Sequence, residues 1–117
     1  MEVDELTERL ARIRERFANA LNSKVDDSFA SLSKFSGATG IETIVVTHRR
    51  LHEMCGLAPS VGFPETGKAA RSAESVLRDP AKFKRLLTPA ETVAFTVELN
   101  GLRKAAQTDL QSGSVRG

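Results

Sequence analysis

The fold of this chain is decided by residues 39–80, TGIETIVVTHRRLHEMCGLAPSVGFPETGKAARSAESVLRDP. Thr39 and Glu42 have the spacing of a capping box, which predicts the start of a helix that runs to about Ala58. A proline and a glycine follow and close that helix, and Pro64 suits the first turn of the next one. The inner face of this next helix is expected to be small and apolar, with Thr66, Ala69, Ala70, Ala73, Val76 and Leu77. The stretch therefore predicts two antiparallel helices joined by a short turn.

Apolar residues also recur at helical spacing before this pair, at Leu6, Leu10, Ile13, Phe17 and Leu21. Asp4 suits the N-cap of this segment. Asn22-Ser23 interrupts the pattern, which resumes at Val25 and continues to about Phe35. We therefore expect two helices separated by a bend or a short break, followed by a turn over residues 36–40.

One more long helix is expected after the pair. Asp79-Pro80 is expected to end the preceding helix, and residues 81–87 then form a basic connector. A second capping box, Thr88-Pro89-Ala90-Glu91, starts the last helix. A strand is also compatible with the alternation of Val93, Phe95, Val97 and Leu99. The cap and the apolar continuation through Leu110 favour a helix, with fraying expected from about residue 112.

These segments predict an all-α fold, an antiparallel up-and-down four-helix bundle with an additional N-terminal helix, formed by residues 1–117 as a single domain. Of the 117 residues, 40% are hydrophobic and 27% are charged, which excludes a disordered or collagen-like chain. A net charge of +2 is weak support for nucleic-acid binding. No apolar run is long enough to cross a membrane, and the acidic first residues do not resemble a secretory signal. A lone cysteine, Cys55, fits a reducing compartment, so we expect a cytoplasmic protein. We also expect it to be a monomer.

The two histidines are both expected on the helix that starts near Thr39. A step of 100° per residue puts His48 near the middle of the apolar stripe and His52 at its margin. We therefore expect His48 to be packed in the core with one satisfied nitrogen, and His52 to have one side open. Gly56, one turn beyond His52, costs helix stability and must serve a purpose. Three readings stay open: it leaves room beside His52, it lets the next helix pack closely, or it begins the helix's end.

Residues 52–64, HEMCGLAPSVGFP, resemble the signature of histidine-containing phosphotransfer (HPt) domains. That motif has a histidine, a glycine four residues on, a small residue two further and another glycine ten residues after the histidine. Gly56, Ala58 and Gly62 occupy those places, and residues 69–74, AARSAE, are similar to the family's next helix. The length and the helix order also suit the family across nearly the whole chain.

The resemblance implies a component of a two-component phosphorelay, in which His52 accepts a phosphoryl group from a receiver-domain aspartate and passes it on. Its partners are then receiver domains of response regulators or hybrid histidine kinases, and the receiver brings the Mg²⁺. The chain itself needs no cofactor and has no turnover of its own. Many family members carry lysine where this chain has Cys55, and serine often stands at position 57, where this chain has leucine. Arg49, Lys68 and Arg71 are the basic residues we expect to supply the missing charge. Lys68 lies roughly level with His52 if the two helices pair antiparallel about residue 61.

The residues bear on three other classes of function. Residues 62–69, GFPETGKA, match GxxxxGK but lack both the serine or threonine and the preceding strand of a P-loop, which argues against ATP binding. His48, His52 and Cys55 share overlapping helix faces, but a fourth ligand for zinc is missing. A helical adaptor without phosphoryl chemistry stays open as the alternative.

Overall fold

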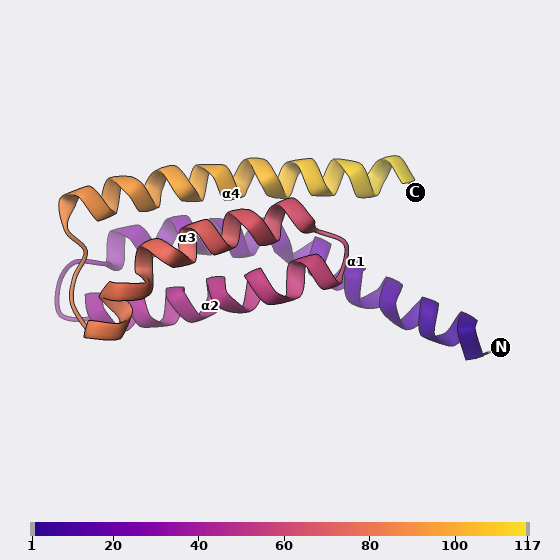
Figure 1. Ribbon diagram of the computed structural model, residues 1–117, viewed down its shortest axis with the longest axis horizontal. Helices are drawn as coiled ribbons and strands as arrows, with labels where there is room; N and C mark the ends of the chain where they lie inside the picture. Colours follow the sequence, from indigo (N-terminus) through magenta and orange to yellow (C-terminus); the bar gives the residue numbers. More distant parts are fainter. Residues whose placement is uncertain (1, 117) are drawn as a thin grey trace.

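The chain folds into four antiparallel helices in a computed structural model (Figure 1), which describes the backbone of residues 2–116 and the side chains of residues 4–112. The helices are α1 (Glu2–Ser31), α2 (Gly40–Ser60), α3 (Pro64–Phe83) and α4 (Pro89–Arg116), and a short 3₁₀ turn, η1 (Leu32–Lys34), follows α1. The predicted all-α four-helix fold is confirmed. The described helices include none that is both long and apolar enough to span a membrane.

The core combines aliphatic side chains with phenylalanines and runs along the bundle. Helix α2 packs most extensively on α3, and α3 packs on α4, whereas α1 makes fewer contacts with α4 and α2. Its side chains are almost fully buried, among them Leu21, Ile44, Leu51, Leu77, Phe95, Leu99 and Leu102. Residues 93–99 are helical, as part of α4. Phe95 and Leu99 are buried while Val93 and Val97 are exposed, whereas a strand would place all four on one face, so the helical interpretation is confirmed.

The additional N-terminal helix is not present, because α1 continues without a break through Asn22 and Ser23. Both side chains are exposed, while Phe17, Leu21 and Val25 on either side of them stay buried at helical spacing. The polar pair therefore faces solvent and does not interrupt the helix. The predicted N-cap, Asp4, is also wrong, since α1 already begins at Glu2.

The first turns of α1 extend beyond the rest of the bundle (Figure 1). Leu6, Leu10 and Ile13, predicted to lie on the buried face, are 58%, 51% and 38% exposed there. The apolar stripe is continuous along α1, but its side chains are buried against other described residues only from Phe17 onward.

The end of α3 differs from the prediction. The helix does not stop at Asp79 but continues through Pro80 to Phe83, where Lys84 adopts the left-handed conformation with φ 52°. Pro80 is fully buried, so the packing of its ring compensates for the hydrogen bond that a proline removes from a helix. The expected connector is therefore shorter, and the amide of Arg85 closes the helix end by donating to the Pro80 carbonyl at 3.0 Å.

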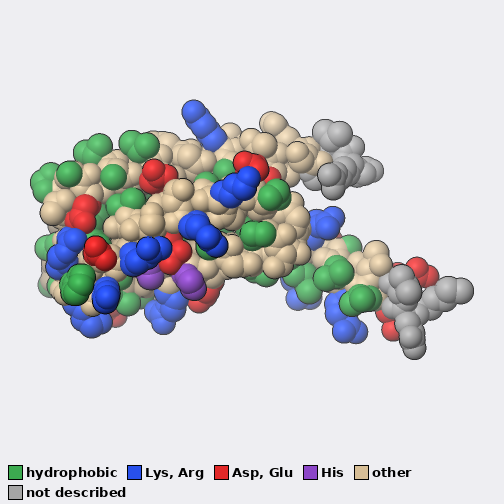
Figure 2. Space-filling model, in the orientation of Figure 1, with side chains coloured by type: hydrophobic (Ala, Val, Ile, Leu, Met, Phe, Trp, Pro, Cys, Tyr) green, Lys and Arg blue, Asp and Glu red, His purple; other side chains and the backbone are tan. Residues whose placement is uncertain are grey.

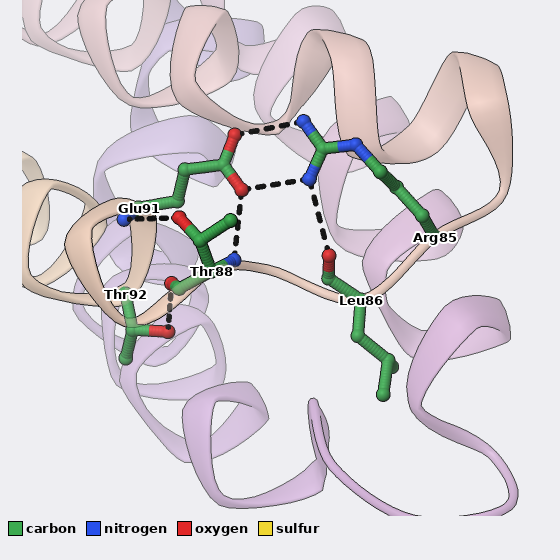
Figure 3. A network of polar contacts seen from close by, with 5 residues as sticks. All are labelled: Arg85, Leu86, Thr88, Glu91 and Thr92. Atoms are coloured by element: carbon green, nitrogen blue, oxygen red, sulfur yellow. Dashed lines mark hydrogen bonds and ion pairs between the residues drawn. The ribbon is translucent and has the colours of Figure 1, made fainter.

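Side chains fix two helix starts, and Figure 3 shows the one at α4. At α4 the predicted capping box is confirmed: the Glu91 amide donates to Thr88 Oγ1 at 3.1 Å, and the Thr88 amide donates to Glu91 Oε1 at 2.8 Å. Arg85 adds two hydrogen bonds to Glu91, and together these contacts lower the pKa of the Glu91 carboxyl from 4.5 to about 2. At α3 the cap comes from α4, since buried Asp109 accepts from the Thr66 amide and hydroxyl at 2.7 and 2.8 Å.

The other predicted capping box, at the start of α2, is wrong. Thr39 makes no capping hydrogen bond with its side chain, and Thr43 instead donates from its amide and its hydroxyl to the Thr39 carbonyl. The fraying expected beyond residue 112 concerns side chains outside the described residues, although the α4 backbone is helical to Arg116.

Candidate functional site

The two histidines stand one turn apart on α2, on the side that faces α3. Their rings are nearly parallel, with an interplanar angle of 18° and centroids 6.5 Å apart. The His52 side chain is 70% exposed and that of His48 is 25% exposed. The expected open edge for His52 is confirmed, whereas His48 is only partly buried. The reason is that the buried face of α2 is centred on Thr47, Leu51 and Met54, which turns His48 toward its margin.

Glu74 from α3 contacts both imidazoles through one oxygen. Its Oε1 lies 2.9 Å from His52 Nδ1, in hydrogen-bond geometry, and 3.4 Å from His48 Nε2. A carboxylate can only accept hydrogen bonds, so the proton of the His52 ring sits on Nδ1. Nε2, on the far side of that ring, is then the nitrogen with the free lone pair. It has no hydrogen bond within the described part of the chain.

Glu74 did not emerge from the sequence as a site residue. The signal that marks it is its place on the inner face of α3, four residues after Ala70 and three before Leu77, both of which are fully buried. Glu74 itself is 6% exposed. A carboxylate rarely lies on such a face unless it has a polar partner.

Two glycines next to the site have different surroundings. A Cβ on Gly56 would meet nothing within 4 Å, so this glycine is not needed for helix packing, and α2 continues past it to Ser60. These two observations contradict the packing and helix-end interpretations of Gly56, and the interpretation that it leaves room beside His52 stays a prediction. The close approach of the helices occurs at Gly67, where a Cβ would lie 2.7 Å from the Pro59 ring.

The basic residues around the site come from both helices. Arg71 and Arg78 lie one turn before and one turn after Glu74, and both are exposed. Arg49 is exposed one turn before His52. Figure 2 shows Lys and Arg side chains gathered on the face that carries the two histidines. Glu74 lies level with His52, so Lys68 lies about 9 Å nearer the α2–α3 turn and not level with His52 as expected. There its Nζ lies 3.5 Å from Glu65 Oε2.

The remaining sequence motifs form no separate site. Cys55 is half-buried and packs against the core. No group of three or more His, Cys, Asp or Glu residues with the arrangement of a metal site occurs among the described residues, and the alternative of zinc on His48, His52 and Cys55 finds no support. Residues 62–69, the GxxxxGK match, form the α2–α3 turn and the first turns of α3. The described residues 2–116 contain no strand, so the strand that precedes a P-loop is missing.

Comparison of the chain with protein-family models, with curated proteins and with solved structures finds no match.

Proposed function

We propose that this chain is a histidine phosphotransfer protein that carries a phosphoryl group on Nε2 of His52. One observation carries the proposal: the His52 ring is held at Nδ1 by a buried carboxylate at 2.9 Å while 70% of the side chain is open to solvent. An imidazole in this state is a nucleophile of fixed orientation, because the carboxylate selects the tautomer. The open space above Gly56 supports the approach of a second protein to that nitrogen.

The transfer step needs little from this chain beyond positioning. The Nε2 lone pair of His52 attacks the phosphorus of a receiver's aspartyl phosphate in line, and the Nε2–P bond forms as the P–O bond to the aspartate breaks. The aspartate leaves as a carboxylate, and the ring becomes positively charged. Glu74 offsets that charge through the Nδ1 hydrogen bond, so that no proton has to enter or leave. In the reverse direction the electron pair of the Nε2–P bond returns to Nε2.

The charge around His52 supports an acidic partner. Arg49, Arg71 and Arg78 are exposed on the two helices that carry the site, and Lys68 extends the basic surface toward the turn. Receiver domains hold their phosphorylated aspartate in an acidic pocket with Mg²⁺, so the proposal assigns the metal to the partner. Complementary charge of this kind increases the rate of encounter more than the affinity.

The test is incubation of the chain with receiver domains that have been phosphorylated with ³²P. We expect acid-labile, base-stable label on the protein, equal label on His48→Gln, and none on His52→Gln. Glu74→Gln should transfer roughly tenfold more slowly, because outer residues that orient a reactive group commonly contribute this much. Label that persists in His52→Gln contradicts the assignment. Receiver binding that survives in His52→Gln, with no label on any variant, favours the helical adaptor instead.

A further inference from the structure

His48 carries a buried nitrogen without a hydrogen bond. Its Nε2 is the one buried side-chain N or O atom in the described part of the chain that has no hydrogen-bond partner. It lies 3.4 Å from Glu74 Oε1, the same oxygen that accepts the His52 hydrogen bond. The two atoms are near enough for a weak interaction but do not form a hydrogen bond in this conformation, so a side-chain adjustment is needed to form one.

Glu74 can accept a hydrogen bond from a second donor. Its side chain is 8% exposed, and its polar contacts within the described residues are with His52 Nδ1 and His48 Nε2 only. A buried carboxylate with a single hydrogen bond is poorly compensated for its lost hydration. A carboxylate oxygen has two lone pairs, so Oε1 has the capacity for both imidazoles.

We propose that His48 is a positioning residue for the phosphoacceptor: its Nε2–H donates to Glu74 Oε1 and holds the carboxylate in the orientation that keeps the His52 proton on Nδ1. The two imidazoles and the carboxylate then form one unit, in which only His52 touches the incoming phosphoryl group. The consequence for transfer rests on the proposed function, whereas the consequence for the His52 tautomer does not.

The test compares two substitutions of His48 in the full chain. His48→Gln keeps an N–H donor near the position of Nε2, and His48→Phe keeps a ring of similar size without a donor. Side-chain ¹⁵N NMR of unphosphorylated protein reports the His52 tautomer, with Glu74→Gln as the reference for a lost carboxylate. We expect His48→Phe to shift the His52 nitrogens toward that reference, and His48→Gln to stay near the original values. Where the phenylalanine disturbs folding, as judged by circular dichroism, His48→Leu makes the same comparison.

Phosphoryl transfer gives the second readout. We expect His48→Phe to slow transfer from a phosphorylated receiver roughly threefold to tenfold, and His48→Gln to restore it. Unchanged His52 shifts in His48→Phe overturn the proposal, as does an equal defect in the two variants. Shifts that move as expected while no receiver ever labels the chain leave His48 as a positioning residue and remove the phosphotransfer function.

Discussion

The same substitution should have opposite effects on stability at two glycines of the α2–α3 hairpin. Gly56 lies inside α2, where a Cβ would meet nothing within 4 Å. Gly67 lies in α3, where a Cβ would come within 2.7 and 2.8 Å of two carbons of the Pro59 ring. A third glycine, Gly101, is also exposed with nothing within 4 Å of a Cβ, and it serves as the control because it lies on α4, which does not carry the histidines.

The magnitudes follow from these contacts. Glycine inside a helix costs about 0.5–1 kcal/mol relative to alanine, so Gly56→Ala and Gly101→Ala should each stabilise the protein by about that amount. For a chain of this length the gain corresponds to an increase in Tm of about 2–5 °C. At Gly67 an overpacking cost of about 1–3 kcal/mol exceeds the same gain, so Gly67→Ala should destabilise the protein.

The phosphotransfer proposal adds a second expectation for Gly56. Helical side chains tilt toward the N-terminus, so a methyl group at position 56 leans over the turn that carries His52. Gly56→Ala should therefore slow transfer from a receiver about threefold even though it stabilises the fold. Gly101→Ala should gain stability without this loss.

Urea denaturation measures the stability of the three variants, and labelling by a phosphorylated receiver measures transfer. A destabilised Gly56→Ala, or a stabilised Gly67→Ala, would refute the packing argument. Equal transfer rates for the Gly56 and Gly101 variants would refute the idea that the partner approaches over Gly56.

Four further substitutions test the caps and the exposed start of α1. Asp109→Ala removes the acceptor for the Thr66 amide and hydroxyl, and should cost about 2–4 kcal/mol in urea denaturation, while Thr66→Val, which loses only the hydroxyl, costs less. Glu91→Gln loses the ion pair with Arg85, and should cost roughly 0.5 kcal/mol at pH 7. Because the Arg85 contacts, together with the hydrogen bonds to Thr88, lower the pKa of the Glu91 carboxyl from 4.5 to about 2, the difference from the unaltered protein should be constant above pH 4.5 and vanish as the pH falls toward 2. Leu10→Gln, at a side chain 51% exposed, should change the free energy of unfolding by less than about 0.5 kcal/mol.

The helices and the open edge of His52 could be predicted because they depend on local spacing. The capping box at Thr88 and Glu91 and the apolar period of each helix involve residues within one or two turns of each other. The missing break at Asn22 and Ser23 shows the limit of such reasoning. Two polar residues at solvent-facing positions do not end a helix whose buried face continues at Val25.

Glu74 was missed because its role depends on the register between two helices. Pairing α2 and α3 about residue 61 places Lys68 roughly level with His52, whereas the hydrogen bond from His52 to Glu74 centres the pair on residue 63. Residue 63 is also midway between Pro59 and Gly67, which are in contact. The close packing at Gly67 and the His52 hydrogen bond therefore agree on the same register of the two helices.

The small shift in register decides the chemistry of the site. When the centre of the α2–α3 pairing moves by two residues, the α3 residue opposite His52 changes by about four positions, which is roughly 6 Å along the helix. The earlier centre puts apolar Ala70 opposite the ring, and the observed one puts Glu74 there. Gly67 is therefore more than a packing residue, because the proline it accommodates helps to align the carboxylate with the imidazole. It follows that a Gly67→Ala chain that still folds should also weaken the His52–Glu74 hydrogen bond, and the His52 ¹⁵N shifts would reveal this loss.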